Sequence, residues 1–103
     1  MRTILIPLSV AIALFSFSAA FAADDAAALF KTHCQSCHGA DGGRAPSKGV
    51  EPIKGQSAAD LLKKLEGYKD GTFGGARKMT MENVVKRLSD EQLKALADYS
   101  ATL

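Results

Sequence analysis

Both cysteines of this 103-residue chain lie in one pentapeptide, Cys34-Gln35-Ser36-Cys37-His38. Residues i, i+3 and i+4 of a helix share one face, so the two thiols and the imidazole would project together. C-x-x-C-H at this spacing is the attachment signature of a c-type haem, whose two vinyl groups react with the thiols. The motif therefore predicts one covalently bound haem c, with Cys34 and Cys37 as thioether residues and His38 as the proximal iron ligand.

Three other kinds of site also use a C-x-x-C pair. A disulfide between Cys34 and Cys37 suits an oxidising compartment. A thioredoxin-like redox pair expects a βαβ setting, which the sequence pattern does not provide. A zinc site would need Cys34, Cys37, His38 and His33 as ligands, and structural zinc normally joins chain segments that are far apart. Haem attachment is therefore favoured.

The first 22 residues have the layout of a secretory signal peptide. Arg2 is their one charged side chain, the apolar stretch runs from Ile4 to Phe17, and the segment ends in Ala20-Phe21-Ala22. This order of basic, apolar and small residues predicts export to the periplasm and cleavage after Ala22. An uncleaved membrane anchor is the alternative, since the segment is nearly long enough to span a bilayer.

Cleavage would leave one domain, residues 23–103, which is short for a stable hydrophobic core. Chains of this size usually need a disulfide, a metal, a cofactor or a partner, and a buried haem would meet that need. The whole chain has 13 basic and 11 acidic residues and no tryptophan. Removal of Arg2 makes it nearly neutral, without the basic excess or stacking residues of a nucleic-acid binder.

Apolar residues at helical spacing predict an all-α domain of three or four short helices around the haem. One helix is expected over 24–33. A second should start at the N-cap Ser57 and stop at Gly67, and a short helical piece should follow Met81. The segments 39–55 and 68–78 are rich in glycine and are expected to be loops. No run of alternating apolar residues indicates a strand.

The last helix has the clearest boundary signal. Ser89 and Gln92 form a capping-box pattern at its start. An apolar stripe at i, i+3, i+4 and i+7 then predicts its buried face, which consists of Leu93, Leu96, Ala97 and Ser100.

The sixth position on the iron separates the possible functions. A thioether there favours electron transfer, whereas an open position permits ligand binding or catalysis. The candidates are Met79 and Met81, both after the second glycine-rich loop. Met81 is the better placed to point inward, because an apolar helical turn follows it.

His33 should point about 100° away from Cys34 in a helix, and is interpreted as a solvated or interface histidine.

These features resemble class I cytochromes c, specifically the short bacterial monohaem kind exemplified by the c-553 cytochromes. The resemblance extends from Asp24 to Leu103. It includes Phe30 four residues before the first cysteine, the segments CQSCHGADG and GQSAADLLKKLEGYKDG, and a methionine followed by ENVVKRLSDEQLKALADY.

The resemblance implies further contacts and ligands. In that family the axial methionine immediately precedes the helix corresponding to ENVVKR, which implies Met81 as the second axial ligand and leaves Met79 as the second choice. The first and last helices cross, and the matching contact would join Ala26 and Phe30 to Leu96 and Tyr99. A proline carbonyl usually accepts a hydrogen bond from the proximal histidine. Neither Pro46 nor Pro52 has a matching spacing, so this role is assigned to no residue.

Together these features predict a periplasmic single-electron carrier that is not itself an enzyme. The alternatives are a haem enzyme or sensor with a displaceable methionine, active as a peroxidase or in gas binding, or the haem subunit of a larger oxidoreductase. We expect a monomer without stable membrane insertion after cleavage, and transient partners such as a periplasmic dehydrogenase, hydrogenase or oxidase.

The middle segment has nine basic and five acidic residues between Arg44 and Lys86. Its cationic side chains are interpreted either as a docking surface for an acidic partner or as a solvated face: Lys48, Lys54, Lys63, Lys64, Lys69, Arg77, Lys78 and Lys86.

Overall fold

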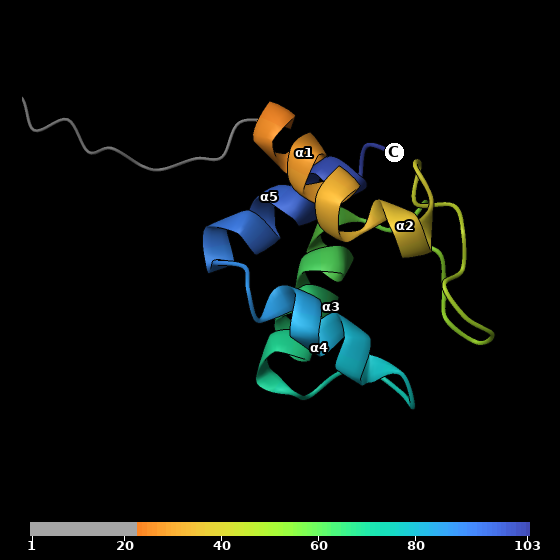
Figure 1. Ribbon diagram of the computed structural model, residues 1–103. Coiled ribbons are helices and arrows are strands. Elements are labelled where there is room, and N and C mark those ends of the chain that lie inside the picture. Colours follow the sequence, from red (N-terminus) through yellow and green to blue (C-terminus); the bar gives the residue numbers. More distant parts are fainter. Residues whose placement is uncertain (1–22) are drawn as a thin grey trace, which may run out of the picture.

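The computed structural model describes residues 23–103, and this part of the chain is helical without strands. Figure 1 shows its helices in chain order, namely α1 (Ala23–His33), α2 (Gln35–His38), α3 (Ala58–Asp70), α4 (Lys78–Val85) and α5 (Asp90–Ser100). The predicted all-α class is confirmed. The signal peptide over residues 1–22 and its cleavage site lie outside the described residues, so both stay predictions. From residue 23 onward, none of the helices combines the length and apolar character needed to cross a bilayer.

Helix α5 packs against α1 and α3, and α4 packs against α3. The core between them consists of five buried side chains: Phe30, Val85, Leu88, Leu93 and Leu96. The ring of Phe30 lies 5.7 Å from that of Tyr99, centroid to centroid, which confirms the predicted crossing of the first and last helices. In Figure 1, α2 and the loop that follows it lie on one flank of this bundle.

Helix α5 forms as its sequence predicts. The Ser89 hydroxyl accepts a hydrogen bond from the Gln92 amide at 3.1 Å, and the Gln92 side chain accepts one from the Ser89 amide at 2.9 Å. These two bonds satisfy free amides of the first turn. The predicted stripe is buried along its whole length, at Leu93, Leu96, Ala97 and Ser100.

The predicted end of the second long helix is wrong. Helix α3 begins after its N-cap Ser57, as expected, but it runs through Gly67 to Asp70 and is capped by Gly71 at φ +81°. Gly67 does not end the helix but allows close packing, because a Cβ there would lie 2.5 Å from the Cβ of Phe73. The chain after the helix therefore folds back directly onto the Gly67 backbone.

The predicted start of the fourth helix is also wrong. Helix α4 begins at Lys78, so Met79 and Met81 both lie within it and the irregular segment before it is shorter than expected. Lys78 and Glu82 form an ion pair across the first turn, with a nitrogen–oxygen distance of 3.8 Å. The apolar stripe that ends at Val85 includes Met81, so packing on the core extends the helix toward its N-terminus.

Candidate haem-binding site

The C-x-x-C-H motif forms the short helix α2 directly after α1. The amide of Cys34 donates to the carbonyl of Phe30 at 2.8 Å, and the amide of His38 donates to the carbonyl of Cys34 at 2.9 Å. Helical geometry therefore continues across Cys34, and Cys34, Cys37 and His38 occupy one turn as predicted. Both thiols are free; Cys34 is half-buried and Cys37 is exposed. Burial raises the pKa of Cys34 to about 11.

The imidazole of His38 is buried. It is 8% exposed, and its Nδ1 atom has no hydrogen-bond partner among the described residues. Burial lowers the pKa of His38, because the interior disfavours the charged form. A neutral imidazole is the form that binds iron. Buried polar atoms are normally hydrogen-bonded, so an imidazole left free beside two free thiols fits the predicted haem attachment.

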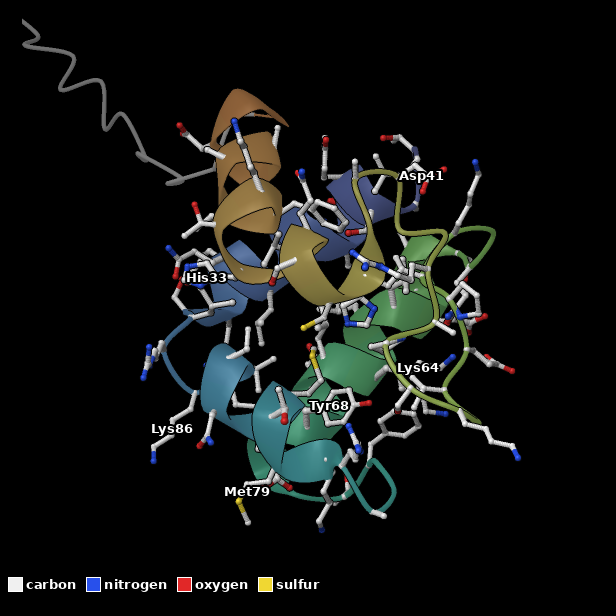
Figure 2. All side chains as sticks on the ribbon, turned by 45° about the vertical axis from the view of Figure 1, so that its right-hand side comes forward. His33, Asp41, Lys64, Tyr68, Met79 and Lys86 are labelled. Carbon is white, nitrogen blue, oxygen red and sulfur yellow. The ribbon has the colours of Figure 1, made fainter. Side chains whose placement is uncertain are left out.

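The two methionines of α4 differ in their surroundings. Met79 is 70% exposed, and Figure 2 shows its side chain at the outer end of α4. Met81 is half-buried and packs against the core cluster of Phe30, Val85, Leu88, Leu93 and Leu96. Residues two positions apart lie about 200° apart around a helix, so α4 directs one thioether outward and the other inward. Cys34 packs against this same cluster.

Apolar side chains from several segments adjoin the core cluster that Cys34 also contacts. They are half-buried and pack against the core cluster: Ile53, Leu62, Leu65, Tyr68, Met81 and Val84. Tyr68 meets Phe73 edge to face, with ring centroids 5.0 Å apart, and burial raises the pKa of its hydroxyl. This aromatic pair was not predicted from the sequence. The available signal was Tyr68 followed by the glycine-rich turn that contains Phe73.

The loop between α2 and α3 is held by charged side chains. Lys54 donates to Asp41 at 3.0 Å, and its amide donates to the Gly42 carbonyl; the Lys54 ammonium beside Asp41 lowers the pKa of that carboxyl. Lys64, labelled in Figure 2, reaches from α3 to Glu51 and to Gln56 on the loop. Two ion pairs therefore fix the loop beside the motif.

Neither proline of the loop accepts the hydrogen bond that the proximal histidine usually donates to a proline carbonyl in this family. The carbonyl of Pro52 accepts a hydrogen bond from the Gln56 side chain at 2.8 Å. His38 donates to neither Pro46 nor Pro52 through Nδ1. His33 ends α1 and is half-buried, and Figure 2 places it on the flank of α1 away from the loop. It does not point toward the loop side of the motif, and its interpretation as a solvated or interface residue stays a prediction.

Comparisons with known proteins agree with this arrangement. The family model for cytochrome c matches residues 23–103. A cytochrome c-553 of Nitratidesulfovibrio vulgaris is 51% identical over 104 aligned positions that cover all of both chains. A cytochrome c-553 of Desulfomicrobium norvegicum is 45% identical over 67% of this chain and 84% of its own, and one from Helicobacter pylori is 33% identical over 90% and 93%.

The match extends over the same residues as the helical domain and includes its C-x-x-C-H turn. A 51% identity over complete chains is well above the level that establishes common family. The chain therefore belongs to the cytochrome c family, as a small class I member of electron transport that carries one covalently attached haem c.

Proposed function

We propose that the protein is a periplasmic electron carrier in which Cys34 and Cys37 hold the haem as thioethers and His38 and Met81 ligate its iron. One observation carries this proposal. A single turn presents two free thiols and a buried imidazole whose Nδ1 has no hydrogen-bond partner within residues 23–103, and this turn lies beside the core that Met81 contacts from α4. When bound, the haem supplies one-electron cycling between ferric and ferrous iron.

The protein's own residues would keep the ligands unchanged during that cycle. Burial lowers the pKa of His38 and so favours its neutral form, and Met81 is held by packing against the core. With His38 and Met81 both bound to the iron, little rearrangement would be needed when the iron changes charge, and no position would be left for a substrate. This supports a carrier over a peroxidase or a gas-binding sensor.

The apolar side chains that pack on the same core cluster as Cys34 would exclude water from most of the ligand sphere. Ile53 comes from the loop, Leu62 and Leu65 from α3, and Val84 from α4. Such surroundings disfavour the form of the centre that carries the higher net charge. Together with a thioether ligand, this supports a raised reduction potential.

Export to the periplasm rests on the sequence of residues 1–22. Arg2, the apolar stretch and the Ala20-Phe21-Ala22 end favour a cleaved signal peptide. Amino-terminal sequencing of the exported protein tests this proposal, which expects Ala23 as the first residue. Retention of the segment in a membrane fraction would contradict it.

The partners would be redox proteins that bind transiently through an acidic surface. Several cations of the middle segment are engaged within the protein, since Lys54 pairs with Asp41, Lys64 with Glu51, and Lys69 with Asp90 at 3.0 Å. Lys48, Lys63, Arg77 and Lys86 are exposed and in none of the ion pairs found among residues 23–103. These four are the cations best placed to attract an acidic partner.

Acid–acetone extraction tests the covalent attachment. Haem should stay with the native polypeptide, whereas the Cys34→Ala/Cys37→Ala variant should release any haem that it holds. Single substitutions at each cysteine should each retain one thioether, which a pyridine haemochrome spectrum distinguishes from two. Release of the haem from the native protein, or retention by the double variant, would overturn the assignment of the two cysteines.

A further inference from the structure

The carbonyl groups at the end of α2 need partners, because the last carbonyls of any helix have none within it. The amide of Gly39 donates to the Gln35 carbonyl at 2.9 Å. Two more carbonyls are satisfied by one residue of the following loop. The amide of Arg44 donates to the His38 carbonyl at 3.0 Å, and its guanidinium Nη2 donates to the Ser36 carbonyl at 3.0 Å.

The turn between α2 and Arg44 closes tightly on that residue. Gly39 has φ +85°, a conformation that glycine adopts without strain. A Cβ at Gly39 would lie 3.3 Å from the Cβ of Arg44 and 3.5 Å from its amide nitrogen. The chain thus leaves α2 through a glycine with positive φ and returns at once, so that Arg44 reaches the carbonyl end of the helix.

The position of Arg44 also suits its charge. A cation near the C-terminal carbonyls of a helix interacts favourably with them, and a hydrogen bond from a charged donor is stronger than a neutral one. The Ser36 carbonyl lies between the two cysteines of the motif, and the His38 carbonyl belongs to the proximal ligand itself. Fixing both carbonyls fixes the peptide planes on either side of the turn that carries the ligand.

Within the part of the chain that the structure describes, no hydrogen bond to Nδ1 orients the imidazole of His38. Its Nδ1 has no partner among the described residues, and ligating histidines are usually oriented by such a partner. We propose that Arg44 is a positioning residue for the proximal ligand, which sets the orientation of His38 through the main chain of α2. This inference rests on the proposed role of His38 as an iron ligand.

The test uses the holoprotein and three variants. Arg44→Gln removes the charge and the guanidinium, and Arg44→Lys keeps the charge and can donate one hydrogen bond to a carbonyl. Lys48→Gln is the matched control, because Lys48 lies exposed on the same loop and its removal changes the net charge by the same amount. Three properties are measured. They are the hyperfine-shifted NMR resonances of the His38 ring in the ferric protein, the rate of amide hydrogen exchange at Gly39 and Arg44, and the midpoint potential.

Arg44→Gln should shift the His38 resonances and raise amide exchange at Gly39 about tenfold, the change expected from losing one charge-assisted hydrogen bond. Arg44→Lys should restore both readouts at least in part, and Lys48→Gln should leave both at their native values. Unchanged His38 resonances and Gly39 exchange in Arg44→Gln would overturn the positioning role. So would equal shifts of the potential in Arg44→Gln and Lys48→Gln without any change at His38, because Arg44 would then act only as a charge. A native ferric protein without hyperfine-shifted His38 signals would instead overturn the proposed ligation, and the positioning role with it.

Discussion

Substituting Gly67 by alanine has two opposite effects on the stability of α3, one from helix propensity and one from a steric contact. Gly67 lies in the interior of this helix, where alanine is intrinsically more favourable than glycine by roughly 0.5–1 kcal/mol. A Cβ at this position, however, would lie 2.5 Å from the Cβ of Phe73, whereas carbon atoms pack at about 3.5–4.0 Å. Relieving such a short contact between two Cβ atoms by shifting the backbone typically costs about 1–3 kcal/mol.

The steric cost is larger, so Gly67→Ala should lower the free energy of unfolding by about 1 to 2 kcal/mol. Urea unfolding of the holoprotein, followed by far-ultraviolet circular dichroism and by the Soret band, measures this change. The midpoint should fall without a change in the slope with denaturant. Gly75→Ala is the control, because nothing lies within 4 Å of a Cβ built at Gly75, and it should be neutral or slightly stabilising.

A second background tests the cause. Phe73→Gly removes the Cβ that an alanine side chain at position 67 would meet, so on this background Gly67→Ala should increase stability by roughly 0.5–1 kcal/mol. The two substitutions should therefore be strongly non-additive. Equal or greater stability of the single Gly67→Ala variant would refute the reasoning, and so would the same loss of stability in the presence and in the absence of the Phe73 side chain.

Two further predictions concern charged side chains. Lys54 lowers the pKa of Asp41 below its ordinary 3.8, so the stabilisation from this pair should be complete above that value and be lost as pH falls through the lowered pKa. A carboxyl NMR titration should show Asp41 below 3.8 in the native protein and closer to it in Lys54→Ala; identical titrations would refute the pairing. Lys63→Glu should slow electron transfer to an acidic native partner at low salt and have little effect at high salt, because the Debye length is about 8 Å at physiological ionic strength. Lys64→Glu should in addition lower stability, since Lys64 pairs with Glu51, and a native rate that is flat or rises with salt would show that docking is mainly apolar.

The elements that could be predicted from the sequence are those with local determinants. The start of α5 depends on Ser89 and Gln92, three residues apart, and its buried face depends on one apolar stripe. The N-cap Ser57 of α3 is equally local. The C-x-x-C-H turn belongs to this class, because its residues are placed by helical spacing alone.

The ends of α3 and α4 could not be predicted, because they depend on contacts between segments. Gly67 has the local features of a helix stop, but Phe73 folds back on it and makes it a packing position. Helix α4 extends to Lys78 because Met81 contributes to a face that packs on the core. A glycine or a methionine carries no sign of such a contact in its immediate sequence.

The supporting residues of the site were also beyond sequence reasoning. Arg44 reaches Ser36 only because Gly39 turns the chain back on α2. Lys64 reaches the loop at Glu51 and Gln56 only because α3 lies beside it. In each case the sequence shows a cationic residue but not its partner, because the partner depends on the path that the loop takes in the folded protein.

The central claim, a haem held between His38 and Met81, is tested most directly by comparing the two methionines of α4. The sulfur–iron absorption band at the red end of the visible spectrum should be present in the ferric native protein and in Met79→Ala, whose side chain is exposed in the native structure. Met81→Ala should abolish this band and lower the midpoint potential markedly, because it removes the thioether ligand. Loss of the band in Met79→Ala and its survival in Met81→Ala would contradict the proposed ligation, and absence of the band from the native protein would contradict methionine ligation altogether.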